Sequence, residues 1–84
     1  MANHHIKILD TFADAVYNGE KTFEIRENDR GYQRGDFVTF TVVRKDGTEN
    51  NSHGLRGKVF VITYVLSGWG LKEGYVALGI REDK

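Results

Sequence analysis

The segment from Lys58 to Leu66 most limits what this chain can fold into, because it is the longest run with the composition of a strand. Its apolar residues occupy both alternating sets of positions, Val59, Val61 and Val65 on one face and Phe60, Ile62, Tyr64 and Leu66 on the other. A strand that is apolar on both faces needs cover on both sides. The segment therefore predicts a strand of a small barrel with a helix packed outside it.

One segment near the N-terminus has the spacing of a short helix. Its apolar positions recur every three or four residues, at Ile8, Phe12, Ala15 and Val16. Asp10 or Thr11 can cap its start, and Thr11 with Asp14 has the spacing of a capping box. Asn18-Gly19 predicts its end, because glycine readily adopts the left-handed conformation required after the last turn.

The remaining apolar runs are short and are separated by turn residues, which is typical of β-structure. The predicted strands are His5 to Leu9, Thr22 to Arg26, Phe37 to Arg44, Lys58 to Leu66 and Tyr75 to Arg81. Thr48 to Gly57 is polar and is expected to be a mobile loop, and Ser67 to Gly74 is a glycine-rich loop. One helix with these strands predicts an α+β fold, a small and mostly antiparallel barrel, as a single domain over residues 1–84.

The charge balance limits the kinds of partner that the chain can bind. Of its 84 residues, twelve are lysine or arginine and twelve are aspartate or glutamate. Proteins that bind nucleic acid without specificity depend on a net positive field, which this chain lacks. Any contact with RNA or a nucleotide should therefore be local, in a pocket or at a short basic patch.

Several other classes are not expected from the sequence. The chain has no cysteine, so neither a disulfide framework nor a thiolate metal site can form. No apolar stretch is long enough to cross a bilayer and the first residues do not resemble a signal peptide, so we expect a cytoplasmic protein without a membrane partner. His4, His5 and His53 lack carboxylate partners at ligand spacing, so no metal and no cofactor are expected.

The run from Gly19 to Arg26 carries the strongest functional signal. In a regular strand, Thr22, Glu24 and Arg26 share one face, which lets Glu24 and Arg26 pair, while Phe23 and Ile25 face the core. Lys21 can join Glu24 only if the chain is still turning as it leaves the helix. A Lys–Glu pair removed from water can bind an amide or a base edge, or transfer a proton. The alternative is a cluster of ion pairs at the surface.

Two further segments contain candidate binding residues. Asn28, Asp29 and Arg30 can line the same site, and Arg30 presents a planar fork to a carbonyl or phosphate, but these residue types also favour a turn. Trp69 lies between two glycines, where it can stack on a base or fill the end of the barrel. In the same loop Lys72 is a lesser binding candidate, and Glu73 is a candidate second carboxylate.

These features together resemble an ASCH domain of the PUA-like superfamily, specifically a small uncharacterised subfamily of bacteria and phages. The matching segments are His4-x-Ile6-Lys7-Ile8, Gly19-Glu20-Lys21-Thr22-Phe23-Glu24-Ile25-Arg26, Asn28-Asp29-Arg30, Gly35-Asp36, Thr63-Tyr64-Val65-Leu66 and Gly70-Leu71-Lys72-Glu73-Gly74-Tyr75-Val76. The resemblance implies a PUA-like β-barrel in which the Gly-x-Lys-x-x-Glu-x-Arg motif lines an RNA-binding cleft.

The resemblance also implies an alternative, because one branch of ASCH proteins hydrolyses N(4)-acetylcytidine. That branch uses the motif lysine, a hydroxyl residue at the position of Glu24, and a downstream carboxylate. Lys21 carries over, and Glu73 is the candidate downstream carboxylate, but Glu24 replaces the hydroxyl. We therefore expect a module that binds RNA or a modified nucleobase or nucleotide. The alternatives are an amidohydrolase that uses Lys21, Glu24 and Glu73, and a protein-interaction domain of a phage or mobile element.

Overall fold

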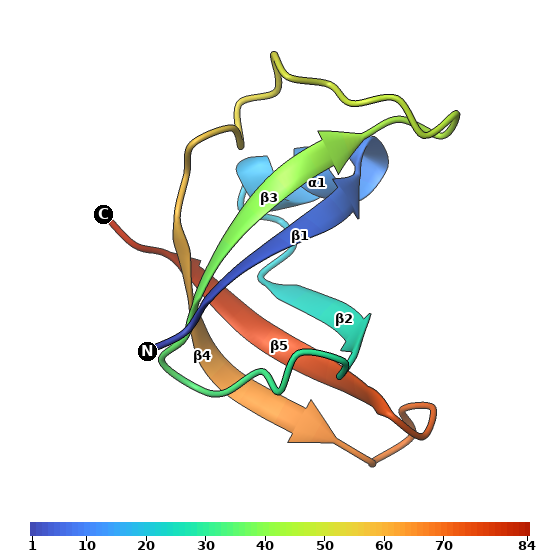
Figure 1. Cartoon of the computed structure of the whole chain (residues 1–84), viewed down its shortest axis with the longest axis vertical. Coiled ribbons are helices and arrows are strands. Elements are labelled where there is room, and N and C mark those ends of the chain that lie inside the picture. Colours follow the sequence, from blue (N-terminus) through green and yellow to red (C-terminus); the bar gives the residue numbers. More distant parts are fainter.

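The computed structural model describes residues 1–84 and has one helix and five strands. In chain order the elements are β1 (Asn3–Leu9), α1 (Asp10–Tyr17), β2 (Phe23–Glu27), β3 (Phe37–Val43), β4 (Phe60–Ser67) and β5 (Tyr75–Glu82). Figure 1 shows β1 and β3 side by side with α1 behind them, while β4, β5 and β2 form the other half of a bent sheet. The predicted α+β class and the single early helix are confirmed.

The sheet has the order β1-β3-β4-β5-β2 and is mostly antiparallel, as predicted. The exception is the parallel pair of β1 and β3, which runs in register from Asn3 opposite Phe37 to Leu9 opposite Val43. The strands at the two ends of this order, β1 and β2, share no ladder of hydrogen bonds, so the sheet is open. The prediction of a closed barrel is wrong in this respect.

Helix α1 packs against β1 and β3 through Ala13 and Val16, which are buried. The predicted capping box does not form, because the N-cap residue is Leu9 and no side chain caps the first turn. The predicted end is confirmed: Asn18 is the C-cap, and Gly19 follows with a φ of 78°. The chain reverses there, and the amides of residues 20 and 21 both donate to the carbonyl of Ala15.

The core is one apolar cluster that draws on every element except β2. Its members are Ile6, Ile8, Ala13, Val16, Tyr32, Val38, Phe40, Val42, Leu55, Phe60, Ile62, Val76, Leu78 and Ile80. Leu55 is fully buried, so the segment predicted as a mobile loop is anchored in the core through this side chain. In place of an apolar residue, β2 directs a carboxylate inward.

Strand β4 is not covered on both sides as predicted. Phe60 and Ile62 face the core, and the register then shifts at a bulge around Thr63, after which Val65 packs against the core instead. The ring of Tyr64 is 61% exposed as a result. A bulge adds one residue to a strand and so exchanges its two faces, which alternation in the sequence does not reveal.

Candidate functional site

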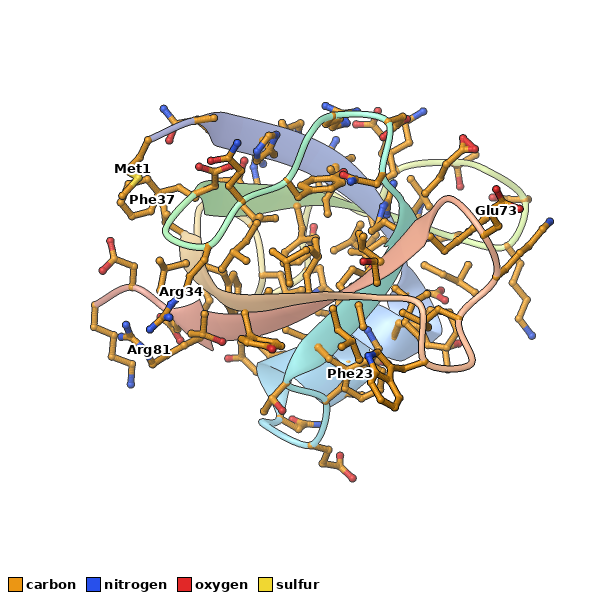
Figure 2. All side chains as sticks on the ribbon, turned by 90° about the horizontal axis from the view of Figure 1, so that it is seen from below. Met1, Phe23, Arg34, Phe37, Glu73 and Arg81 are labelled. Atoms are coloured by element: carbon orange, nitrogen blue, oxygen red, sulfur yellow. The ribbon has the colours of Figure 1, made fainter.

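Strand β2 presents its charged face to the interior and its apolar face to solvent. Glu24 is only 6% exposed, whereas Phe23 and Ile25 are 45% and 50% exposed. The register explains this, because Glu24 lies opposite Leu78, a fully buried residue of the inner face of β5. The prediction that Phe23 and Ile25 face the core is therefore wrong. Phe23 is visible beside β2 in Figure 2.

Two cations hold the carboxylate of Glu24. Lys21 Nζ lies 2.6 Å from Oε1, and Arg26 Nη1 lies 3.3 Å from Oε2. All three side chains are largely buried, with exposed fractions of 15% for Lys21, 8% for Glu24 and 26% for Arg26. The predicted pairing of Glu24 with Arg26 is confirmed. Because both carboxylate oxygens are bound, the side chain is fixed in one orientation.

Lys21 reaches Glu24 because the chain is still turning after the helix. Lys21 lies before the start of β2, in the turn that begins at Gly19. Its Nζ also donates a hydrogen bond to the carbonyl of Phe23 at 2.6 Å. The condition set by the sequence is thus met. Two half-exposed rings flank the ammonium, with centroids 5.5 Å away for Phe12 and 5.0 Å away for Phe23. The lysine therefore combines a charge with two aromatic neighbours.

Arg26 links the ion pairs to the open edge of the sheet. The same Nη1 that contacts Glu24 donates to the carbonyl of Lys7 at 2.6 Å, across the gap between β2 and β1. An edge strand exposes unpaired backbone carbonyls, and a guanidinium with its planar set of donors can satisfy one of them. One side chain therefore serves both the motif and the closure of the fold.

Tyr32 is a neighbour of this arrangement that the sequence did not identify as a site residue. Its side chain is buried against His4, with 4.7 Å between ring centroids, and its hydroxyl has no hydrogen-bond partner. Burial raises the pKa of the Tyr32 phenol, and the charges of Arg26 and Arg30 offset part of this rise. A buried hydroxyl without a partner costs roughly 1–3 kcal/mol, so the stability of the fold does not explain its presence.

The largest hollow of the molecule borders the motif at Lys21. It has a volume of about 810 Å³, within the range of small-molecule sites. It lies where the end of α1 meets β4 and β5, and its lining comprises Val16, Tyr17, Gly19, Lys21, Thr22, Phe60, Thr63, Ile80, Arg81, Glu82 and Lys84. Glu24 and Arg26 are not part of this lining. They stand behind Lys21 and hold it in place.

The other predicted site residues lie elsewhere. Asn28 stabilises a turn, since its Oδ1 accepts from the amide of Tyr32 at 3.1 Å. Asn28, Lys72 and Glu73 line a separate hollow of about 360 Å³ beside the loop between β4 and β5. Figure 2 shows Glu73 on that loop. Glu73 therefore lines a different hollow from Lys21.

Asp29, Arg30 and Trp69 are all at the surface. The side chains of Asp29 and Arg30 are 61% and 45% exposed and approach one another to 4.0 Å. Trp69 is 90% exposed, so it does not fill the end of the sheet, which was one of its two predicted roles. Its φ of 53° is unusual for a residue other than glycine, and its neighbours Gly68 and Gly70 also have positive φ.

The histidines form separate pairs and not one cluster. His4 Nε2 lies 2.9 Å from Asp36 Oδ2, and His53 Nε2 lies 2.7 Å from Asp14 Oδ1. No group of three His, Cys, Asp or Glu side chains converges as a metal site would require. The hydrogen bond from His4 lowers the pKa of Asp36, helped by the amides of residues 2 and 33. In addition, α1 is too short and too polar to cross a membrane.

The fold and site define a small α+β domain with a buried, ion-paired motif beside a hollow of ligand size. The sequence matches the family model described as "Domain of unknown function (DUF3850)" over residues 3–80. The chain therefore belongs to the DUF3850 family. No curated protein matches it.

Proposed function

We propose that this chain is a binding module for RNA or for a modified nucleobase or nucleotide, built as an ASCH domain of the PUA-like superfamily. The observation that carries the proposal is the inverted strand β2, which buries Glu24 and leaves Phe23 and Ile25 in solvent. Burying an ion pair contributes little to stability, and well-packed apolar residues often do as well or better. A role in ligand binding accounts for the buried charges beyond the bridge from Arg26 to Lys7.

The chemistry beside Lys21 suits a planar, polar ligand. Two of the three donors of the ammonium are directed to Glu24 and to the Phe23 carbonyl, which leaves one for a ligand in the hollow. The half-exposed rings of Phe12 and Phe23 supply stacking surface on either side. Glu24 and Arg26 position Lys21, which presents its ammonium to the hollow. A base edge with a carbonyl acceptor meets these requirements.

A binding measurement with a matched pair of variants tests the proposal. Nucleosides, N(4)-acetylcytidine, nucleoside monophosphates and short RNA oligomers are titrated into the wild type, into Lys21→Met and into Lys45→Met, which removes an exposed lysine of a turn. We expect at least one ligand to bind the wild type and Lys45→Met equally and Lys21→Met at least tenfold more weakly. Equal binding by all three proteins, or none, contradicts the proposal.

An amidohydrolase is the second candidate, and the lining of the large hollow favours it. Thr22 contributes a hydroxyl and Glu82 a carboxylate to the same hollow as Lys21, which are the residue types used by the enzymatic ASCH branch. Glu82 is bound to Lys58 at 3.1 Å, however, and both oxygens of Glu24 are held by cations, which weakens either carboxylate as a base. If the protein is an amidohydrolase, it should release cytidine from N(4)-acetylcytidine. Lys21→Met and Thr22→Val should each abolish this release.

A further inference from the structure

The outer face of β2, β5 and β4 carries apolar side chains that the fold leaves exposed. In one row across the three strands, Phe23 lies opposite Gly79, which lies opposite Tyr64. In the next row, Ile25 lies opposite Ala77, which lies opposite Leu66. Phe23, Ile25 and Tyr64 are each about half exposed or more. We call these six residues the outer face.

The rows leave room for flat groups between the rings. Neighbouring strands are about 4.8 Å apart, so the strands of Phe23 and Tyr64, with β5 between them, are roughly 10 Å apart. Gly79 and Ala77 form a low floor between these rings. The hydroxyl of Thr63 lies over Gly79, because a Cβ built on this glycine would meet Thr63 Oγ1 at 2.7 Å. Planar bases can stack against such rings.

The outer face is continuous with the hollow at Lys21. Thr63 and Arg81 line the hollow, and both are exposed residues beside the row of Phe23, Gly79 and Tyr64. Phe23 itself is shared, since its ring contacts the ammonium of Lys21 at 5.0 Å. An extended ligand that leaves the hollow therefore passes Thr63 and continues along the outer face.

Cations stand at the border of these rings. Arg81 follows Gly79 on the same side of β5, Lys21 lies beside Phe23, and Lys72 lies 5.4 Å from the ring of Tyr75. Glu27, opposite Tyr75, is the acidic residue of this side of β2. Figure 2 labels Phe23 and Arg81 in this half of the sheet. Rings bordered by cations fit a polyanion that carries planar groups, which is the chemistry of single-stranded nucleic acid.

We infer that the outer face is a stacking platform for single-stranded RNA, on which nucleotides next to the one in the hollow place their bases against Phe23 and Tyr64. The inference rests on the proposed function, because the hollow supplies the first nucleotide. Trp69 extends the platform, since it lies two residues beyond the end of β4 and is 90% exposed. The RNA is recognised as a strand of several nucleotides and not as a single base.

Binding of eight-nucleotide RNA homopolymers, compared with nucleoside monophosphates, tests the platform. The proteins are the wild type, Tyr64→Leu, which keeps apolar area and removes the ring, and Tyr64→Phe, which keeps the ring. Stacking of a base on an aromatic side chain corresponds to roughly 5- to 150-fold in affinity. We expect octamers to bind more tightly than monophosphates, Tyr64→Leu to lose that gain, and Tyr64→Phe to keep it. Monophosphate binding should be the same in all three proteins.

Three results would overturn the platform, and they separate it from the proposed function. If monophosphates bind, and octamers bind no better and are unaffected by Tyr64→Leu, the platform is wrong while the hollow stands. If neither ligand binds, both inferences fail. If sedimentation shows a wild-type dimer that Tyr64→Leu dissociates, the outer face is an interface between copies of the chain.

Discussion

Arg26 on β2 donates a 2.6 Å hydrogen bond to the backbone carbonyl of Lys7 on β1, two strands that share no other pairing in the sheet. The same nitrogen lies 3.3 Å from Glu24. The ion pairs of the motif and the contact between the two edge strands thus depend on one side chain.

Replacing Arg26 should therefore affect both stability and binding. Arg26→Ala leaves the Lys7 carbonyl and one oxygen of Glu24 without a partner, which should cost roughly 1–3 kcal/mol. Urea unfolding measures this loss. Arg34→Ala, at an exposed position, is the matched control and should be neutral. Equal midpoints for the two variants would show that the bridge does not support the fold.

The ion pairs are expected to serve binding more than stability. Lys21→Met alone leaves one oxygen of the buried carboxylate without a partner while Arg26 still holds the other, which should destabilise the protein by about 1–3 kcal/mol. Lys21→Met with Glu24→Leu should recover most of that loss, because apolar residues replace a buried pair well. Thermal unfolding compares the two variants, and neither should bind ligand. A double variant less stable than the single one would mean that the pair is structural.

Tyr32→Phe should leave the unligated protein as stable as the wild type or raise its stability by up to about 1–3 kcal/mol, because the hydroxyl has no partner. The same change should leave ligand binding unchanged, because the hydroxyl is buried and Tyr32 does not line the hollow at Lys21. Denaturant unfolding and titration measure the two effects. A large loss of stability would show that the hydroxyl has a partner within the protein.

Acid should weaken the fold through Asp36. Its pKa lies below the ordinary 3.8 because of the hydrogen bond from His4, so the carboxylate stabilises the fold fully above pH 3.8 and loses this effect as the pH falls through the lower folded value. Asp36→Asn should be less stable than the wild type at pH 7 and should depend less on pH below 3.8. Asp83→Asn, at an exposed position, should follow the wild type. Parallel curves for the wild type and Asp36→Asn would contradict the assignment.

Local signals in the sequence predicted the elements well. Asn18-Gly19 ends the helix as expected, since the backbone conformation required there is one that glycine adopts readily. The positions of all five strands were also predicted to within a few residues. These features depend on residues that are neighbours in the sequence, which is why they can be predicted from the sequence alone.

The faces of the strands were harder to predict, because they depend on residues distant in sequence. Alternation in β2 is equally consistent with Phe23 inward or Glu24 inward, and the usual preference for apolar cores selects the wrong one. The pairing of Glu24 with Leu78 and its contacts with two cations decide it. The bulge at Thr63 likewise arises from pairing with β5. The parallel pairing of β1 with β3 and the missing pairing of β1 with β2, which leaves the sheet open, have no local signal.

The most direct test of the central claim, that the buried motif beside the hollow is a ligand site, is an amide chemical-shift titration with a panel of nucleosides, nucleotides and RNA oligomers. We expect a ligand to shift the signals of Lys21, Glu24, Arg26 and Tyr32, and Lys21→Met to remove these shifts while the spectrum remains that of a folded protein. If no member of the panel moves the signals between Lys21 and Tyr32, the claim is wrong, and the exposed apolar side chains would be better explained as a contact with another protein.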